Sequence, residues 1–145
     1  MAALNSFEQG FRLFAGEALN KIVDSINNGF GAKFGYGTGV GGTVTQATSK
    51  ATGVTLNKVC GAITMNAESL AGGAEAAFTL TNSEIAVDDV VVVNIKSGPA
   101  ANTSYMIGIA TVAAGSCDIV LTNLTAGALA ETIVLNFAVI KSVKA

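Results

Sequence analysis

The sequence predicts a mainly β protein: an antiparallel, jelly-roll-like β-sandwich preceded by an N-terminal amphipathic helix or arm. Three observations support this fold class. After residue 42, short segments rich in Val, Thr and Ile alternate with Gly-, Asp- and Ser-containing turns. These segments recur at close to the spacing of about 8–12 residues that is typical of sandwiches and jelly rolls. Before residue 30, apolar residues instead follow helical spacing.

The N-terminal segment has one apolar stripe. Its apolar residues are spaced as on one face of an amphipathic helix and are Phe7, Phe11, Phe14, Ala18, Ile22 and Ile26, with Ala15, Leu19 and Val23 alongside. Gly10 and Gly16 weaken a helix, so the pattern predicts helix over 17–28 and either helix or an extended arm over 7–15. We therefore expect three parts: an arm over residues 1–34, a glycine-rich linker over 35–42 and a β domain over 43–145.

The predicted linker contains a motif that matches the dinucleotide fingerprint G-x-G-x-x-G, read from Gly37 to Gly42. That fingerprint needs a strand before it, a helix after it and an acidic residue about 20 positions later. Here a helical pattern precedes the glycines, Thr-rich β segments follow them, and the first acidic residue downstream is Glu68. The motif therefore predicts a flexible or tightly turning linker and no nucleotide site.

Eight strands are expected in the β region. They are predicted at 42–46, 53–57, 60–65, 77–82, 90–95, 105–112, 117–122 and 132–140. The last is strongly β-prone through Thr132–Phe137 and is expected to be a central strand. A short echo, Leu-Thr-Asn at residues 80–82 and 121–123, predicts two strands that end in the same way.

The composition restricts the function class. Only 12% of the residues are charged, against about 25% in an average soluble domain, and the net charge is −2. Such a surface suits a protein that is covered by copies of itself or by a larger assembly. The basic residues are scattered, which disfavours nucleic-acid binding, and no apolar stretch predicts a membrane span. We also expect no secretory signal in Met1–Leu4, and hence synthesis in a cytoplasm.

The sequence predicts no catalytic, cofactor or metal site. It contains no His, which removes the commonest general base and metal ligand. Cys60 and Cys117 are expected to be reduced core residues, although a disulfide stays open at this point. The acidic group of Glu84, Asp88 and Asp89 lacks the spacing of a calcium loop and predicts a solvated turn.

The aromatic residues are unevenly placed. Five of the seven Phe fall within the first 34 residues, whereas only Phe78 and Phe137 belong to the β region. The N-terminal stripe could pack on the protein's own sheet or on another chain. The residues alone leave these two alternatives open.

Three β segments resemble a module of tailed-bacteriophage virion proteins: residues 43–66 (TVTQATSKATGVTLNKVCGAITMN), 78–93 and 115–141. The N-terminal FRLFAGEALN, residues 11–20, also resembles the R-L-x-x-G-x-x-L-N opening of phage structural proteins, with Arg12, Leu13, Gly16, Leu19 and Asn20 at the matching positions. The resemblance covers most of the chain from Gly35 to Lys144, and none of its motifs is catalytic.

The resemblance implies a non-enzymatic capsid cement or decoration protein on the outer surface of a virion. Its implied partners are the major capsid protein and copies of itself, in a trimer or alternatively a dimer. We expect the partner interface to lie on the N-terminal arm, at Phe7, Phe11, Arg12, Leu13, Phe14, Leu19, Ile22, Val23 and Ile26. Similar modules also end longer fibres, so the alternative function is a receptor- or glycan-binding module of a phage tail or head fibre.

Overall fold

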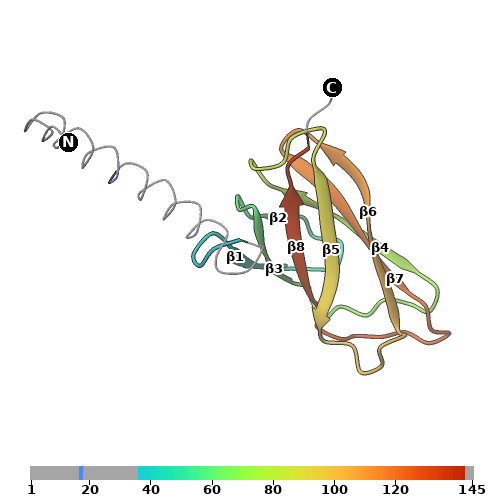
Figure 1. Ribbon diagram of the computed structural model, residues 1–145. Coiled ribbons are helices and arrows are strands. Elements are labelled where there is room, and N and C mark those ends of the chain that lie inside the picture. Colours follow the sequence, from blue (N-terminus) through green and yellow to red (C-terminus); the bar gives the residue numbers. More distant parts are fainter. Residues whose placement is uncertain (1–16, 18–35, 143–145) are drawn as a thin grey trace, which may run out of the picture. The chain divides into compact units, whose positions relative to one another are not determined.

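A computed structural model describes residue 17 and residues 36–142 of the chain. It contains eight strands: β1 (Gly42–Thr45), β2 (Val54–Thr55), β3 (Cys60–Thr64), β4 (Glu75–Thr81), β5 (Val90–Ser97), β6 (Tyr105–Ala113), β7 (Ser116–Asn123) and β8 (Val134–Ile140). Sheet A has the order β1-β3-β8-β5 and sheet B the order β2-β4-β7-β6. Figure 1 shows β5 and β8 side by side in one sheet, and β4, β6 and β7 together in the other.

The eight predicted strands are confirmed, each to within about two residues at its ends. β8 has a neighbour on both sides and is central, as its β-prone sequence predicts. The prediction of purely antiparallel sheets is wrong, because β1 pairs with β3 and β2 pairs with β4 in parallel. The chain alternates between the sheets from β1 to β4. Strands β1, β3 and β5 of sheet A run in one common direction, and so do β2, β4 and β6 of sheet B.

Strand periodicity separates a buried face from an outer face in each sheet. In β7 every second residue is buried, beginning at Cys117, and in β4 the buried residues are Ala76, Phe78 and Leu80. Ile119, Leu121 and Leu135 are fully buried. Buried residues of both sheets belong to one hydrophobic cluster. Burial of each such side chain contributes about 1.5–3 kcal/mol, so this cluster supplies the main stabilisation of the β region.

The repeated Leu-Thr-Asn sequence marks equivalent strand ends in sheet B. Asn82 follows β4 and Asn123 ends β7, and both side chains are completely buried. Each Oδ1 accepts a hydrogen bond from the backbone N–H two residues ahead, at Glu84 (3.0 Å) and Thr125 (2.9 Å). The repeated sequence therefore has one structural cause, because at both places an asparagine side chain stabilises the turn by which the chain leaves the sheet.

Four of the described glycines have positive φ, a conformation that other residues adopt rarely, and two of them shape the connections between strands. Gly115 (φ +82°) is in the two-residue connection of the β6–β7 hairpin, where Ala113 pairs with Ser116. Gly98 (φ +115°) follows β5, and a Cβ there would lie 2.2 Å from the carbonyl oxygen of Thr132. Glycine at these positions allows the hairpin turn and the close approach of the two chain segments.

The chain divides into two compact units between Gly39 and Val40. All eight strands belong to the second unit, Val40–Ala145. Within the fingerprint-like motif Gly39 has φ +87°, and the motif's last residue, Gly42, begins β1. A strand therefore follows these glycines, in agreement with the sequence analysis.

Candidate functional site

The interface residues predicted on the N-terminal arm, from Phe7 to Ile26, lie outside the described residues. The predicted helix also lies outside them, apart from Glu17. The structure therefore places none of these side chains. The surfaces that it does describe are the outer faces of the two sheets.

The outer face of sheet A, called here the A face, is almost free of charge. Its residues alternate with the buried ones along each strand and are Thr43, Thr45, Cys60, Ala62, Thr64, Val90, Val92, Asn94, Lys96, Val134, Asn136, Ala138 and Ile140. Lys96, near the end of edge strand β5, is the only charged residue among them. An outward sheet face that contacts water is normally polar, so this composition is unusual.

Strand register divides the A face into two halves. At one end Val90 pairs with Ile140, and Val92 pairs with Ala138, which in turn pairs with Cys60. Val90, Val92 and Ile140 are 52%, 47% and 52% exposed. The next row, Asn94, Asn136, Ala62 and Thr43, begins the polar half. The exposed aliphatic side chains therefore form one patch across β5 and β8.

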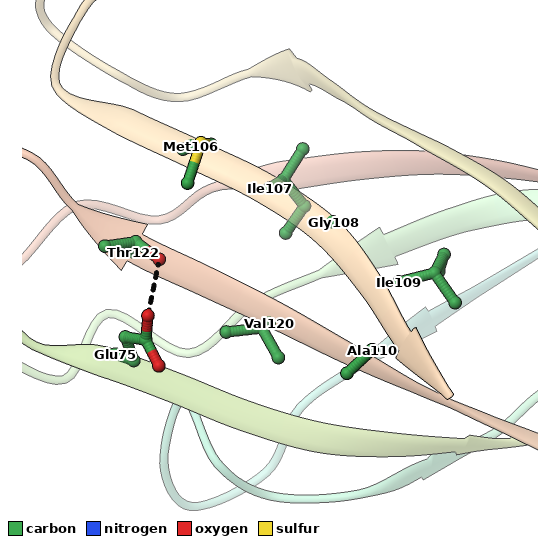
Figure 2. A pocket seen from close by; sticks show the side chains of 8 residues that line it. All are labelled: Glu75, Met106, Ile107, Gly108, Ile109, Ala110, Val120 and Thr122. Atoms are coloured by element: carbon green, nitrogen blue, oxygen red, sulfur yellow. Dashed lines mark hydrogen bonds between the residues drawn. The ribbon is translucent and has the colours of Figure 1, made fainter. Parts of the chain in front are cut away.

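The outer face of sheet B, called here the B face, carries two carboxylates and a hollow. Glu75 and Thr122 lie in one row with Met106, and Thr122 Oγ1 donates a hydrogen bond to Glu75 Oε1 (3.4 Å). The next row contains Gly108, where a Cβ would meet nothing within 4 Å. The resulting hollow has a volume of about 250 Å³. Figure 2 shows the residues that line it, which are Glu75, Met106, Ile107, Gly108, Ile109, Ala110, Val120 and Thr122.

Asp118 connects all three long strands of the B face. Thr79 Oγ1 of β4 donates to Asp118 Oδ1 (2.7 Å), and Thr111 Oγ1 of β6 donates to Oδ2 (2.6 Å). A bulge between Ile109 and Thr111 brings Thr111 opposite Asp118. The hydrogen bonds from Thr111 and then Thr79 lower the pKa of Asp118. The hydroxyls of its own sheet therefore favour the ionised form of this carboxylate.

A buried lysine joins the strand ends of sheet A. The side chain of Lys50 is 2% exposed, and its Nζ donates to the backbone carbonyls of Asn66 and Glu131, both at 2.6 Å. Burial lowers the pKa of Lys50, while the charges of Glu131 and Glu68 oppose this shift. Gln46, also buried, donates from Nε2 to the carbonyls of Lys50 (3.0 Å) and Thr52 (2.8 Å). The ammonium therefore holds together the segments after β1, after β3 and before β8.

Tyr105 lies near enough to Glu131 to be affected by its charge, but each of the two side chains has a buried polar atom without a hydrogen-bond partner. Glu131 Oε1 accepts from the backbone N–H of Ala100 (2.8 Å). Glu131 Oε2 and Tyr105 Oη are buried and form no hydrogen bond of ordinary length and angle. Burial, followed by the nearby Glu131 carboxylate, raises the pKa of Tyr105 to about 12. The buried Tyr105 side chain therefore keeps its proton at neutral pH.

The acidic group at 84–89 differs from the predicted solvated turn. Asp89 is 6% exposed and accepts hydrogen bonds from the Ala86 N–H (2.8 Å) and from Lys141 Nζ (2.8 Å). The hydrogen bond from Lys141 is the main cause that lowers the pKa of Asp89. The prediction is wrong for Asp89 because the partner lysine is 52 positions away in sequence. Asp89 joins the start of β5 to the end of β8.

The two cysteines have different environments. Cys117 of β7 is 1% exposed, and burial raises the pKa of its thiol to about 11. Cys60 is in β3 of the other sheet, half-buried on the A face. Both are free thiols. The expectation of two core residues is therefore right for Cys117 and wrong for Cys60.

Within residues 36–142 and at residue 17, no three His, Cys, Asp or Glu side chains are grouped so that they could hold a metal ion. In the same residues, no helix has the length and apolarity needed to cross a membrane.

No known family model, curated protein or solved structure matches this chain.

Sequence reasoning did not identify the A face or Lys50. Strand alternation could have assigned Val90, Val92 and Ile140 to one face, because all three have the same parity relative to the buried Val91 and Val139. Lys50 had no such signal. It is a single lysine in a Thr- and Ser-rich turn, and its partners lie 16 and 81 positions away.

Proposed function

We propose that this chain is a structural virion protein that decorates and stabilises a bacteriophage capsid by binding the major capsid protein and copies of itself. The observation that carries the proposal is the A face, which exposes Val90, Val92 and Ile140 with only one charge among its outward residues. A permanently covered surface suits such a face. The segments that resemble phage virion modules include all of β2, β3, β7 and β8 and part of β1, β4 and β5.

We further propose that the two sheets form a β-sandwich of jelly-roll type. Strands β3, β8 and β5 pair antiparallel in sheet A, as do β4, β7 and β6 in sheet B. Consecutive strands from β3 to β6 alternate between the sheets. This connectivity and the shared hydrophobic cluster support two facing layers. β1 and β2 then add parallel edge strands to this arrangement.

The N-terminal arm is proposed as the anchor of this protein on a neighbouring chain. The sequence stripe that includes Phe7, Phe11 and Phe14 supports this role. The eight strands form a compact unit that begins at Val40, so deletion of residues 1–34 should leave a folded β domain. We expect the truncated protein to stay soluble and monodisperse but to lose capsid binding. Unfolding or aggregation of the truncated protein would instead assign the stripe to the protein's own core.

The function itself is tested by copy number in purified virions. A cement protein is expected at hundreds of copies per particle, in a simple ratio to the major capsid protein, and mostly as trimers or alternatively dimers. A fibre-tip module is expected at tens of copies. Quantification of both bands from the same particles separates the two functions. A count in the tens, or absence from the particle, would overturn the proposal.

A further inference from the structure

The apolar half of the A face forms one continuous patch. Val90 and Ile140 pair across β5 and β8, and Val92 and Ala138 form the next outward row. Figure 1 shows these two strands running side by side along their length. About half of each large aliphatic side chain is exposed. Since single apolar residues are common on surfaces but grouped ones often mark contact sites, this patch is a candidate contact surface.

Charge favours a second copy of the same chain as that partner. The A face has no carboxylate, and its single charged residue, Lys96, is at the polar end of β5. Beside the apolar end, Lys141 forms an ion pair with Asp89 (2.8 Å). Two A faces can therefore meet without like charges opposed at their apolar centres. Two B faces would bring Glu75 and Asp118 of one copy towards those of the other, which is unfavourable.

We infer that copies of this chain associate through the A face, with Val90, Val92 and Ile140 at the centre of the contact. The inference rests on the proposed function, because it assigns the self-association of that proposal to one surface. It concerns the isolated protein, however, and it can hold or fail independently of capsid binding. The polar row with Asn94 and Asn136 lies at the margin, where hydrogen bonds fix the register of the two copies.

The size of the A face indicates how strongly two copies of the chain should associate. Strands lie about 4.8 Å apart and rise about 3.3 Å per residue, so the flat area of a four-stranded face is about 400 Å². This area does not include the contours of the side chains. Specific interfaces bury about 800 Å² per partner, so the contact is at the weak end. We therefore expect association at micromolar rather than nanomolar concentrations, which multiple contacts in an assembly would strengthen.

Sedimentation velocity on the full chain over about 1–200 µM tests this inference in the concentration range expected for such weak interfaces. The variants are Val92→Lys on the A face, Ala77→Lys on the B face as a matched control, and Val92→Thr, which keeps the β-branched shape without a charge. Val92→Lys should weaken association at least tenfold, while Ala77→Lys should associate as the parent chain does. Val92→Thr should have an intermediate effect, because it loses apolar contact without placing a charge in the interface.

Two results would overturn the inference: a parent chain that stays monomeric over the whole range, or equal association of the parent and Val92→Lys. The second result would assign self-association to another part of the chain. Circular dichroism checks that each variant is folded. Ile140→Lys, at the end of β8, replaces Val92→Lys if the latter does not fold, and the same outcomes apply to it. Capsid binding is measured separately on the same variants, so failure of this inference is distinguishable from failure of the proposed function.

Discussion

The two sheets place their charges in opposite ways. Sheet A has an outer face with one charged residue but keeps a buried ammonium, Lys50, at its strand ends. Sheet B has Glu75 and Asp118 on its outer face, while neutral Asn82 and Asn123 turn the chain at its strand ends. A buried charge is costly unless it is well paired, whereas an exposed one is not. On sheet A, the outer face with a single charged residue is also the face that exposes the aliphatic side chains of Val90, Val92 and Ile140.

The largest expected effect comes from removing the buried charge of sheet A. In Lys50→Met, the carbonyls of Asn66 and Glu131 lose their donor while staying shielded from water. We expect the free energy of unfolding to fall by about 3 kcal/mol, since each unsatisfied buried group costs about 1–3 kcal/mol. Denaturant titration at fixed protein concentration measures this. Lys58→Met, at an exposed lysine, is the matched control and should change little. Equal stability of Lys50→Met and Lys58→Met would show that the ammonium is dispensable.

The neutral strand ends of sheet B are tested by comparing the two asparagines. Asn123 makes five hydrogen bonds through its side chain, whereas Asn82 makes two. Asn123→Ala should therefore cost about 2–3 kcal/mol and Asn82→Ala less, because fewer buried groups lose their partners. Thermal and denaturant unfolding give both values. Asn94→Ala, on the exposed A face, serves as the control. A larger loss of stability for Asn82→Ala than for Asn123→Ala would show that the number of side-chain hydrogen bonds does not determine the cost.

Alkaline pH should destabilise sheet B, because two of its buried side chains, the Cys117 thiol and the Tyr105 hydroxyl, are weak acids. The folded-state pKa is about 11 for Cys117, against an ordinary value of 9.0, and about 12 for Tyr105, against 10.0. In both cases the unfolded chain loses its proton first. Stability is therefore full below pH 9 and falls as pH rises through 9–11 for Cys117 and 10–12 for Tyr105.

Tyr105→Phe isolates the tyrosine contribution to this pH dependence. Because Tyr105 Oη forms no ordinary hydrogen bond, the variant should be nearly as stable as the parent at pH 7. Its stability should then fall less steeply above pH 10. Denaturant midpoints at several pH values between 7 and 12 measure both effects. An unchanged alkaline slope would mean that Tyr105 does not keep its proton in the folded state.

The smallest effect is expected at the exposed carboxylate of the B face. In Asp118→Asn, one of the Thr79 and Thr111 hydroxyls keeps an oxygen acceptor and the other can accept from the new NH2 group, so stability at pH 7 should change little. The folded-state pKa of Asp118 is lowered, so its contribution is present at neutral pH and is lost as pH falls through that value. Acid titration should therefore show a shallower loss of stability in the variant. A steeper acid loss than in the parent would contradict this assignment.

The positions of the strands could be predicted from the sequence, whereas the strand pairing and the contacts between distant residues could not. Strand positions follow from short-range residue preferences, and the central strand β8 follows from its run of β-branched and aliphatic residues. The parallel pairs β1–β3 and β2–β4 could not be predicted, because they depend on how the chain crosses between sheets. The Lys50 and Lys141 contacts join residues up to 81 positions apart. No pattern in a single sequence encodes such pairings.

Thiol labelling in assembled particles tests most directly whether the A face is covered. A single exposed cysteine is introduced as Val92→Cys on the A face or as Ala77→Cys on the B face, each with Cys60→Ala, while Cys117 stays buried. Maleimide labelling rates are then compared between dilute protein and purified decorated capsids. We expect Val92→Cys to be labelled much more slowly on capsids than in dilute solution, while Ala77→Cys reacts at a similar rate in both states. Unchanged labelling of Val92→Cys on capsids, with or without protection of Ala77→Cys, would show that the A face is not covered in the particle.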